Sequence, residues 1–137
     1  MPTSENPVVK EKYINGGFGW YQKVFRSDFE TIAVKRKKYE LLRFWLLGSW
    51  IAKQEELKFV LINLVPSQRE KDIEPQFRCH ILEDKKRTFS RSTWEEIYRF
   101  VQERAITNNH KKEFIEYFKN KTIGYNHQRN LQRAFLL

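Results

Sequence analysis

Apolar residues gather in two neighbouring blocks that predict the clearest elements of this chain. In residues 39–53 the apolar positions 41, 42, 44–47 and 50–52 run almost all the way round a helix, which predicts a helix covered on most sides. Residues 58–65 (KFVLINLV) form a short β-branched run bounded by a charged turn and a proline, which predicts a strand. Its continuous apolarity indicates a central strand covered on both faces. A buried helix before such a strand favours an α/β fold with a small mixed sheet, and α+β is the alternative.

The N-terminal third has weaker patterns. Residues 1–15 are polar, contain two prolines and predict a flexible lead, after which residues 16–137 are expected to form one domain. Asn15-Gly16-Gly17 predicts a turn, since glycine reaches positive φ without a Cβ clash. The apolar spacing over residues 20–32 predicts a helix, with a short strand at residues 29–34 as the alternative.

The remainder of the chain predicts a hairpin followed by C-terminal helices. We expect these elements, in order: a charged loop at 67–76, a second strand at 77–82 (FRCHIL), a turn at 83–86 folding back onto 87–90, a helix from 94 to about 105, and a helix at 110–119. Ser92 and Glu95 have the capping-box spacing, which places a helix start there. We expect the apolar residues Leu131, Phe135, Leu136 and Leu137 to dock on the body of the protein.

The main functional information in the composition is the net charge. Twenty-six Lys and Arg against 17 Asp and Glu give a formal charge of +9, which favours polyanionic partners such as nucleic acid. Cys79 is the only cysteine, so an intrachain disulfide is excluded and a reducing, cytoplasmic setting is expected. The longest apolar run, residues 41–52, contains Arg43 and is shorter than the roughly 20 residues of a membrane span, so no membrane insertion is expected.

Several cations are candidates for contacts with nucleic acid. Lys35, Arg36, Lys37 and Lys38 are consecutive, which is typical either of a solvated helix end or of a phosphate-contacting patch. The further candidates are Arg43, Lys85, Lys86, Arg87 and Arg91.

A magnesium-dependent nuclease would need two carboxylates for the cation and a lysine near the phosphate. Glu83-Asp84-Lys85 follows an apolar run, and Asp72 lies eleven residues before Glu83, so Asp72, Glu83 and Lys85 are the catalytic candidates. The alternative is that Glu-Asp-Lys-Lys is an ordinary hairpin tip. The three histidines lack the spacing of metal ligands.

Four segments resemble, in order, the C-terminal half of PD-(D/E)xK nucleases related to restriction endonucleases: YELLRFW from residue 39, FVLINLVPS from 59, FSRSTWEEIYRFV from 89, and NKTIGY with LQRAFLL near the end. The resemblance covers about residues 20–137. It implies an αβββαβ core whose catalytic Asp and Glu-x-Lys lie on the second and third strands. If residues 39–53 are that core's second helix, the metal-binding strands should precede residue 39.

The sequence departs from that family at the catalytic motif. Ala33 stands where the glutamate of Glu-x-Lys would precede Lys35, so the resemblance implies an incomplete site, in a shortened relative or in a fragment lacking an upstream segment. Magnesium is implied only if the site is intact. By resemblance Arg43 faces the active-site edge, and the alternative is a buried arginine in an ion pair with Glu40 or Glu56.

Three functions therefore stay open. The first is a DNA-binding domain related to these nucleases, without a complete catalytic site. The second is a protein-interaction or assembly module, for example a homo-oligomer, which docks through exposed Phe18, Trp20 and Tyr21. The third is an active magnesium-dependent DNA endonuclease that uses Asp72, Glu83 and Lys85.

Overall fold

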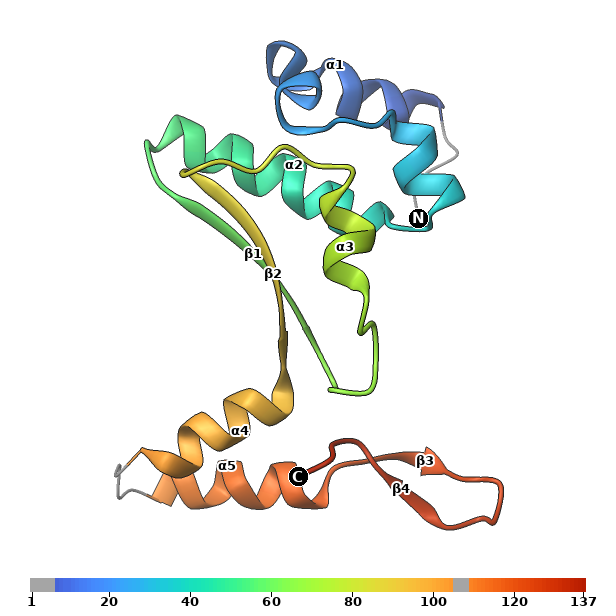
Figure 1. Ribbon diagram of the computed structural model, residues 1–137, viewed down its shortest axis with the longest axis vertical. Helices are drawn as coiled ribbons and strands as arrows, with labels where there is room; N and C mark the ends of the chain where they lie inside the picture. The colour runs from blue at the N-terminus through green and yellow to red at the C-terminus, as the bar shows by residue number, and fades with distance from the viewer. Residues whose placement is uncertain (1–6, 105–108) are drawn as a thin grey trace. The chain divides into compact units, whose positions relative to one another are not determined.

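The computed structural model describes residues 7–104 and 109–137 (Figure 1). Its elements are α1 (Pro7–Val24), the π-helix η1 (Glu30–Lys35), α2 (Tyr39–Gln54), β1 (Phe59–Val65), α3 (Ile73–Arg78), β2 (Arg87–Thr93), α4 (Trp94–Glu103), α5 (Asn109–Asn120), β3 (Thr122–Tyr125) and β4 (Leu131–Arg133). β1 pairs with β2, and β3 pairs antiparallel with β4. The prediction of a mixed fold of helices and strands is confirmed.

The chain packs as two compact units. Unit 1 comprises the chain up to Ile62 together with Asp72–Ser90, and unit 2 comprises Asn63–Lys71 and Arg91–Leu137. Fifteen Lys and Arg against 11 Asp and Glu give unit 1 a formal charge of +4, and 11 against 6 give unit 2 a charge of +5. The excess positive charge is thus shared by both units. A single domain over residues 16–137 stays a prediction, because packing in two units does not decide whether they unfold together.

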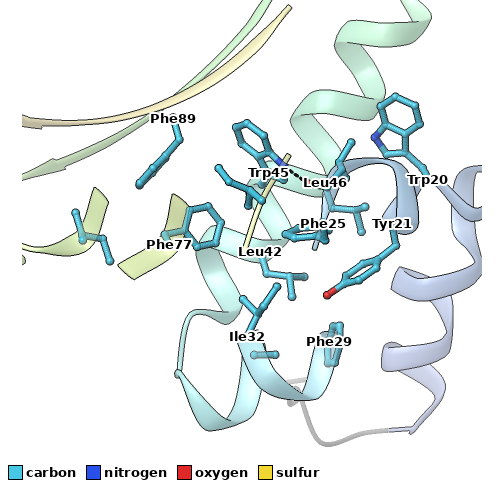
Figure 2. Packing of buried hydrophobic residues seen from close by; sticks show 14 residues of the cluster. Trp20, Tyr21, Phe25, Phe29, Ile32, Leu42, Trp45, Leu46, Phe77 and Phe89 are labelled. Atoms are coloured by element: carbon cyan, nitrogen blue, oxygen red, sulfur yellow. Dashed lines mark hydrogen bonds between the residues drawn. The ribbon is translucent and has the colours of Figure 1, made fainter. Parts of the chain in front are cut away.

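The core of unit 1 is built around α2 (Figure 2). Leu42 and Trp45 are fully buried, and the Trp45 indole Nε1–H donates to the Val24 carbonyl over 2.9 Å. The Trp20 indole Nε1–H donates to the hydroxyl of buried Ser49 over 3.0 Å. Both indoles therefore bury a large apolar area while satisfying their polar group, and they attach α1 to α2.

Burial is less complete than the apolar pattern suggested. α2 is helical as predicted, but Phe44, Leu47 and Ile51 are 46–59% exposed, so the helix is covered on one face only. β1 is also present, but Val60 and Ile62 are exposed and the sheet has two strands. The prediction of a central strand covered on both faces is wrong, because a two-stranded ribbon leaves alternate side chains in solvent.

The N-terminal segments also differ from expectation. Residues 7–15, predicted as a flexible lead, are helical in α1, whereas residues 1–6 lie outside the described chain. The predicted turn is confirmed, since Gly17, Phe18 and Gly19 take positive φ and break α1 into two helical parts. After Val24 the helix stops, and η1 follows in place of the alternative strand.

Residues 67–82 were predicted wrongly. The segment contains the helix α3, which overturns both the loop extending to residue 76 and the strand at 77–82. Pro75 lies in the first turn of α3, where a missing N–H costs no helical hydrogen bond. Ile73 and Phe77 are four residues apart and buried on one helix face, whereas Ile81 makes only a single bridge with Phe25.

The predicted turn at residues 83–86 is confirmed, but its partner strand differs. The Asp84 carboxylate Oδ1 accepts from the backbone N–H groups of Lys86 (2.7 Å) and Arg87 (3.0 Å). The strand that follows is β2, which pairs with β1 and not with residues 77–82.

Unit 2 confirms the C-terminal helices with a shifted cap. Thr93, not Ser92, caps α4: its hydroxyl accepts from the Glu96 N–H (3.1 Å), and the Glu96 carboxylate accepts from the Thr93 N–H (2.8 Å). α4 ends at Glu103, and Ala105 lies outside the described residues. None of the helices in the described ranges is long and apolar enough to cross a membrane.

Phe135 is the side chain of the C-terminal apolar cluster that packs on rings of unit 2 in the described residues. Phe135 stacks on Phe118 at 4.7 Å and lies 6.3 Å from the Trp94 ring. Leu131, Leu136 and Leu137 are 53–60% exposed, so docking of the whole cluster is wrong. The strands β3 and β4, which were not predicted, form within residues 122–133.

Candidate nucleic-acid interface

The run of four cations lies at the end of η1. The Arg36 N–H donates to the Thr31 carbonyl (3.0 Å), and the Lys38 N–H donates to the Ile32 carbonyl (2.9 Å). Between them Lys37 takes φ of 53°, the left-handed conformation that commonly ends a helix. The predicted helix end is therefore present, and the reversal at Lys37 separates its side chain from those of its neighbours.

Three of these cations line a hollow of about 410 Å³. Its walls are Lys35, Arg36 and Lys38 from the end of η1, and Gln76, Cys79 and His80 from the end of α3. Lys37 is not part of the lining. In the part of the chain that the structure describes, none of the four cations of this run pairs with a carboxylate. The hollow therefore combines cations that form no ion pair with a concave shape, and the charge of Lys35 also acts on the Asp28 carboxylate, whose pKa it helps to lower.

His80 is the buried member of this hollow. It is 8% exposed, and its Nδ1 shares a hydrogen bond of 2.7 Å with the Ser27 hydroxyl. The backbone positions it, because the His80 carbonyl accepts from the Arg26 N–H (2.8 Å) and the Leu82 N–H donates to the Val24 carbonyl (2.9 Å). These bonds join residues 80–82 to the end of α1.

Two effects lower the pKa of His80. Burial is the larger, since it disfavours the charged imidazolium, and the positive charge of Arg36 adds to it. The imidazole is therefore neutral near pH 7. A hydroxyl can donate as well as accept, so Ser27 can satisfy Nδ1 in either protonation state. Within the described residues, Nε2 has no hydrogen-bond partner.

Arg43 is engaged within the protein. Its guanidinium lies 3.0 Å from the Glu40 carboxylate and 5.2 Å from the centre of the Phe44 ring, and its side chain is 38% exposed. The expected ion pair between Arg43 and Glu40 is confirmed, but the expected burial of Arg43 is wrong, since its side chain is partly exposed at the edge of α2.

Two further arginines also hold the fold together. Arg87 pairs with Asp84 at 2.6 Å, and its Nε–H donates to the Leu82 carbonyl over 3.1 Å. Arg91 donates to the carbonyls of Ser67 (2.8 Å) and Arg69 (2.9 Å). Of this group of candidates, Lys85 and Lys86 are exposed at the turn before β2.

The catalytic candidates do not form a metal centre. Asp72 is exposed before α3, and Lys85 is exposed in the turn. The Glu83 carboxylate accepts from the Phe89 N–H (2.7 Å) and pairs with Arg78 Nε (3.0 Å). Across residues 7–104 and 109–137, no group of three or more His, Cys, Asp or Glu could hold a metal ion. Glu83 stabilises the turn, as the hairpin-tip alternative proposed.

The strands that the nuclease resemblance placed before residue 39 are also missing from the described part of that region. Residues 30–35, which end at Lys35 and include Ala33, form η1, and Ala33 is buried. Residues 7–38 contain α1, η1 and the single bridge residue Phe25. A metal site of the family's arrangement is therefore not built there.

A second, apolar hollow lies beside the exposed loop of α1. Its volume is about 440 Å³, and it is lined by Lys12, Tyr13, Gly16, Gly17, Trp20, Leu46, Leu47 and Trp50. Phe18 is 97% exposed, as predicted, but Trp20 and Tyr21 are 6% and 5% exposed, so their prediction as docking residues is wrong. Both side chains are buried in the core of unit 1.

Sequence reasoning found the cations of the hollow and missed His80. The two parts of the hollow are far apart in sequence, and Ser27 and His80 are 53 positions apart. The available signal was the four-residue spacing of Ile73 and Phe77, which marks α3 as a helix and so places its end beside the cations.

Comparisons with protein-family models, with curated proteins and with solved structures found no match to this chain.

Proposed function

We propose that this chain binds DNA through its phosphates, as a relative of PD-(D/E)xK nucleases without a complete catalytic site. The observation that carries the proposal is the hollow lined by Lys35, Arg36 and Lys38, which form no ion pair with a carboxylate among the described residues. Phosphate contacts of this kind supply most of the affinity for nucleic acid regardless of sequence. The formal charge of +9 adds long-range attraction.

The relationship to nucleases rests on the resemblance of the four segments, and the absence of catalysis rests on the candidate residues. Ala33 cannot bind a metal, and Glu83 is engaged by Arg78 and by the Phe89 N–H. These side chains therefore support DNA binding without DNA cleavage.

The test measures duplex DNA binding at about 50 and 200 mM salt, with and without magnesium. Each lost phosphate contact reduces the slope of log affinity against log salt by about 0.9. Three contacts thus contribute a slope of about 2.7, which corresponds to roughly a 40-fold loss of affinity over this fourfold change in salt. We expect the triple variant Lys35→Ala, Arg36→Ala, Lys38→Ala to lose this part of the salt dependence.

A matched control removes the same charge elsewhere. Arg99, Lys112 and Lys119 are exposed cations of unit 2, and the triple alanine variant at these positions also lowers the net charge by three. A larger loss in the hollow variant supports the interface. Equal losses in the two triples would attribute binding to net charge and contradict the assignment to this hollow.

The same experiment separates the other two functions. DNA cleavage that requires magnesium and disappears in Glu83→Ala would show an active endonuclease and overturn the proposal. If no DNA is retained at either salt, the interaction module is favoured, since Phe18 is 97% exposed beside an apolar hollow.

A further inference from the structure

The shape and chemistry of the basic hollow suit a terminal phosphate of nucleic acid more closely than an internal phosphodiester. Pockets for small ligands are typically about 300–1,000 Å³, and this hollow measures about 410 Å³. Three cations converge on it from one turn, and a buried histidine with a free Nε2 forms part of its wall. A dianion would use this charge more fully than one phosphodiester, which carries a single negative charge.

We propose that the hollow binds a terminal phosphate of nucleic acid, and that His80 takes up a proton when the phosphate binds. This inference rests on the proposed function and names the group that the same site would prefer. Lys35, Arg36 and Lys38 would supply the charge, and protonation at Nδ1 would turn the Nε2–H group of His80 into a charged donor to the phosphate. Charge-assisted hydrogen bonds of this type are about twice as strong as neutral ones.

The surroundings of His80 permit this change of protonation. Ser27 can accept from Nδ1–H once the ring is charged. Burial and the charge of Arg36 oppose protonation of His80 in the free protein. Lys35 and Lys38 also line the hollow, together with Gln76 and Cys79 from the end of α3. Asp28 is the nearest acid along the chain from Ser27, and the Thr31 N–H holds its pKa below the ordinary value, so it stays ionised. A bound dianion would neutralise the cations and so raise the pKa of His80.

The first arm of the test follows the titration of the His80 ring by NMR, with its signal assigned through His80→Gln. Sulfate is the probe because it remains a dianion throughout the titration, and sodium chloride at equal ionic strength is the control. We expect sulfate to raise the pKa of His80 and chloride to leave it unchanged. Equal effects of the two salts would overturn the inference.

The second arm compares a short single-stranded oligonucleotide carrying a 5′-phosphate with the same oligonucleotide ending in a 5′-hydroxyl. We expect roughly tenfold tighter binding of the phosphorylated form, the gain expected from one charge-assisted contact. Arg36→Gln should abolish this preference. Lys37→Gln is the matched control, since it removes a neighbouring charge that does not line the hollow.

Arg36→Gln and Lys37→Gln change exposed residues, so these two variants test the site even if His80→Gln fails to fold. Equal binding of the two oligonucleotides, or equal effects of the variants at positions 36 and 37, would overturn the inference. If wild type still retains duplex DNA with a steep salt dependence, only the terminal-phosphate assignment fails. If that retention is also absent, the proposed function itself fails.

Discussion

Gly48 on α2 provides a sharp test of how β1 packs in unit 1. A Cβ added at Gly48 would lie 2.3 Å from Phe59 Cε2 and 2.4 Å from its Cζ, well inside van der Waals contact. The Phe59 ring also packs against Trp45 of α2, at 5.6 Å between ring centres. Gly48→Ala should gain about 1 kcal/mol from helix propensity and lose up to about 3 kcal/mol to overpacking, a net loss of roughly 1–2 kcal/mol.

Removing the Phe59 ring should reverse the sign of the change in stability that Gly48→Ala causes. In a Phe59→Val background the clash is absent, so Gly48→Ala should stabilise the protein by up to about 1 kcal/mol through helix propensity alone. The difference between the two backgrounds, roughly 2–3 kcal/mol, is the coupling between the two positions. Urea unfolding of the four proteins measures it.

Gly16→Ala is the matched control for this cycle. A Cβ at Gly16 meets nothing within 4 Å, and its φ of −62° suits alanine, so its effect should be small in both backgrounds. If Gly48→Ala changes stability in the same direction with and without the Phe59 ring, the packing of β1 on α2 described above is refuted.

Two further predictions concern buried polar groups. Glu95 is 5% exposed and accepts from the backbone N–H groups of Ser67 (2.9 Å) and Leu136 (3.1 Å), so Glu95→Ala should cost roughly 2–4 kcal/mol by leaving two donors unsatisfied. Glu95→Gln, which keeps one acceptor oxygen, should cost less in thermal unfolding, and equal losses would contradict this account. The folded protein lowers the pKa of His80, so the unfolded chain binds more protons as pH falls, and stability should decline as pH drops below the ordinary histidine value of about 6.5. Unfolding at pH 7.5 and 5.5 checks this, and a decline of the same size in His80→Gln would assign the effect to other groups.

The elements that sequence predicted best are those with a long, unambiguous period. α2 has sixteen residues, and its apolar positions exclude a strand. The degree of cover was misjudged because Phe44, Leu47 and Ile51 are apolar residues that stay in solvent. An apolar residue on the surface is common in folded proteins, so hydrophobicity alone does not identify the buried face.

Short apolar runs were less informative. Residues 77–82 have the length of a strand, and periodicity alone does not separate a buried strand from one turn of helix at this length. The decisive contacts are tertiary: Phe77 packs edge-on against Phe89 at 4.9 Å, which holds α3 against the start of β2. Interactions between residues far apart in sequence therefore overrode the local pattern.

The candidate site was likewise predicted only in part, because tertiary contacts that the local sequence does not reveal determine which side chains line it. The four cations were visible as a run, but the left-handed Lys37, which excludes its own side chain from the hollow, could not be inferred from four similar residues. His80 was considered only as one of three histidines without metal-ligand spacing, because its partner Ser27 lies in a different part of the chain.

The structure divides the predicted cations by side-chain chemistry. Arg87 and Arg91 donate to backbone carbonyls through planar, multidentate guanidinium groups, a role that a lysine ammonium fills poorly. Lys35 and Lys38 have no such partners in the described chain and line the hollow. If the chain binds DNA as we propose, loss of Arg87 or Arg91 would lower the affinity by disturbing the fold, whereas loss of a lysine in the hollow would act on the contact itself. A reduced affinity is evidence for a phosphate contact only when the free energy of unfolding is unchanged, and we expect substitutions of Lys35 and Lys38 to meet that condition and substitutions of Arg87 and Arg91 to fail it.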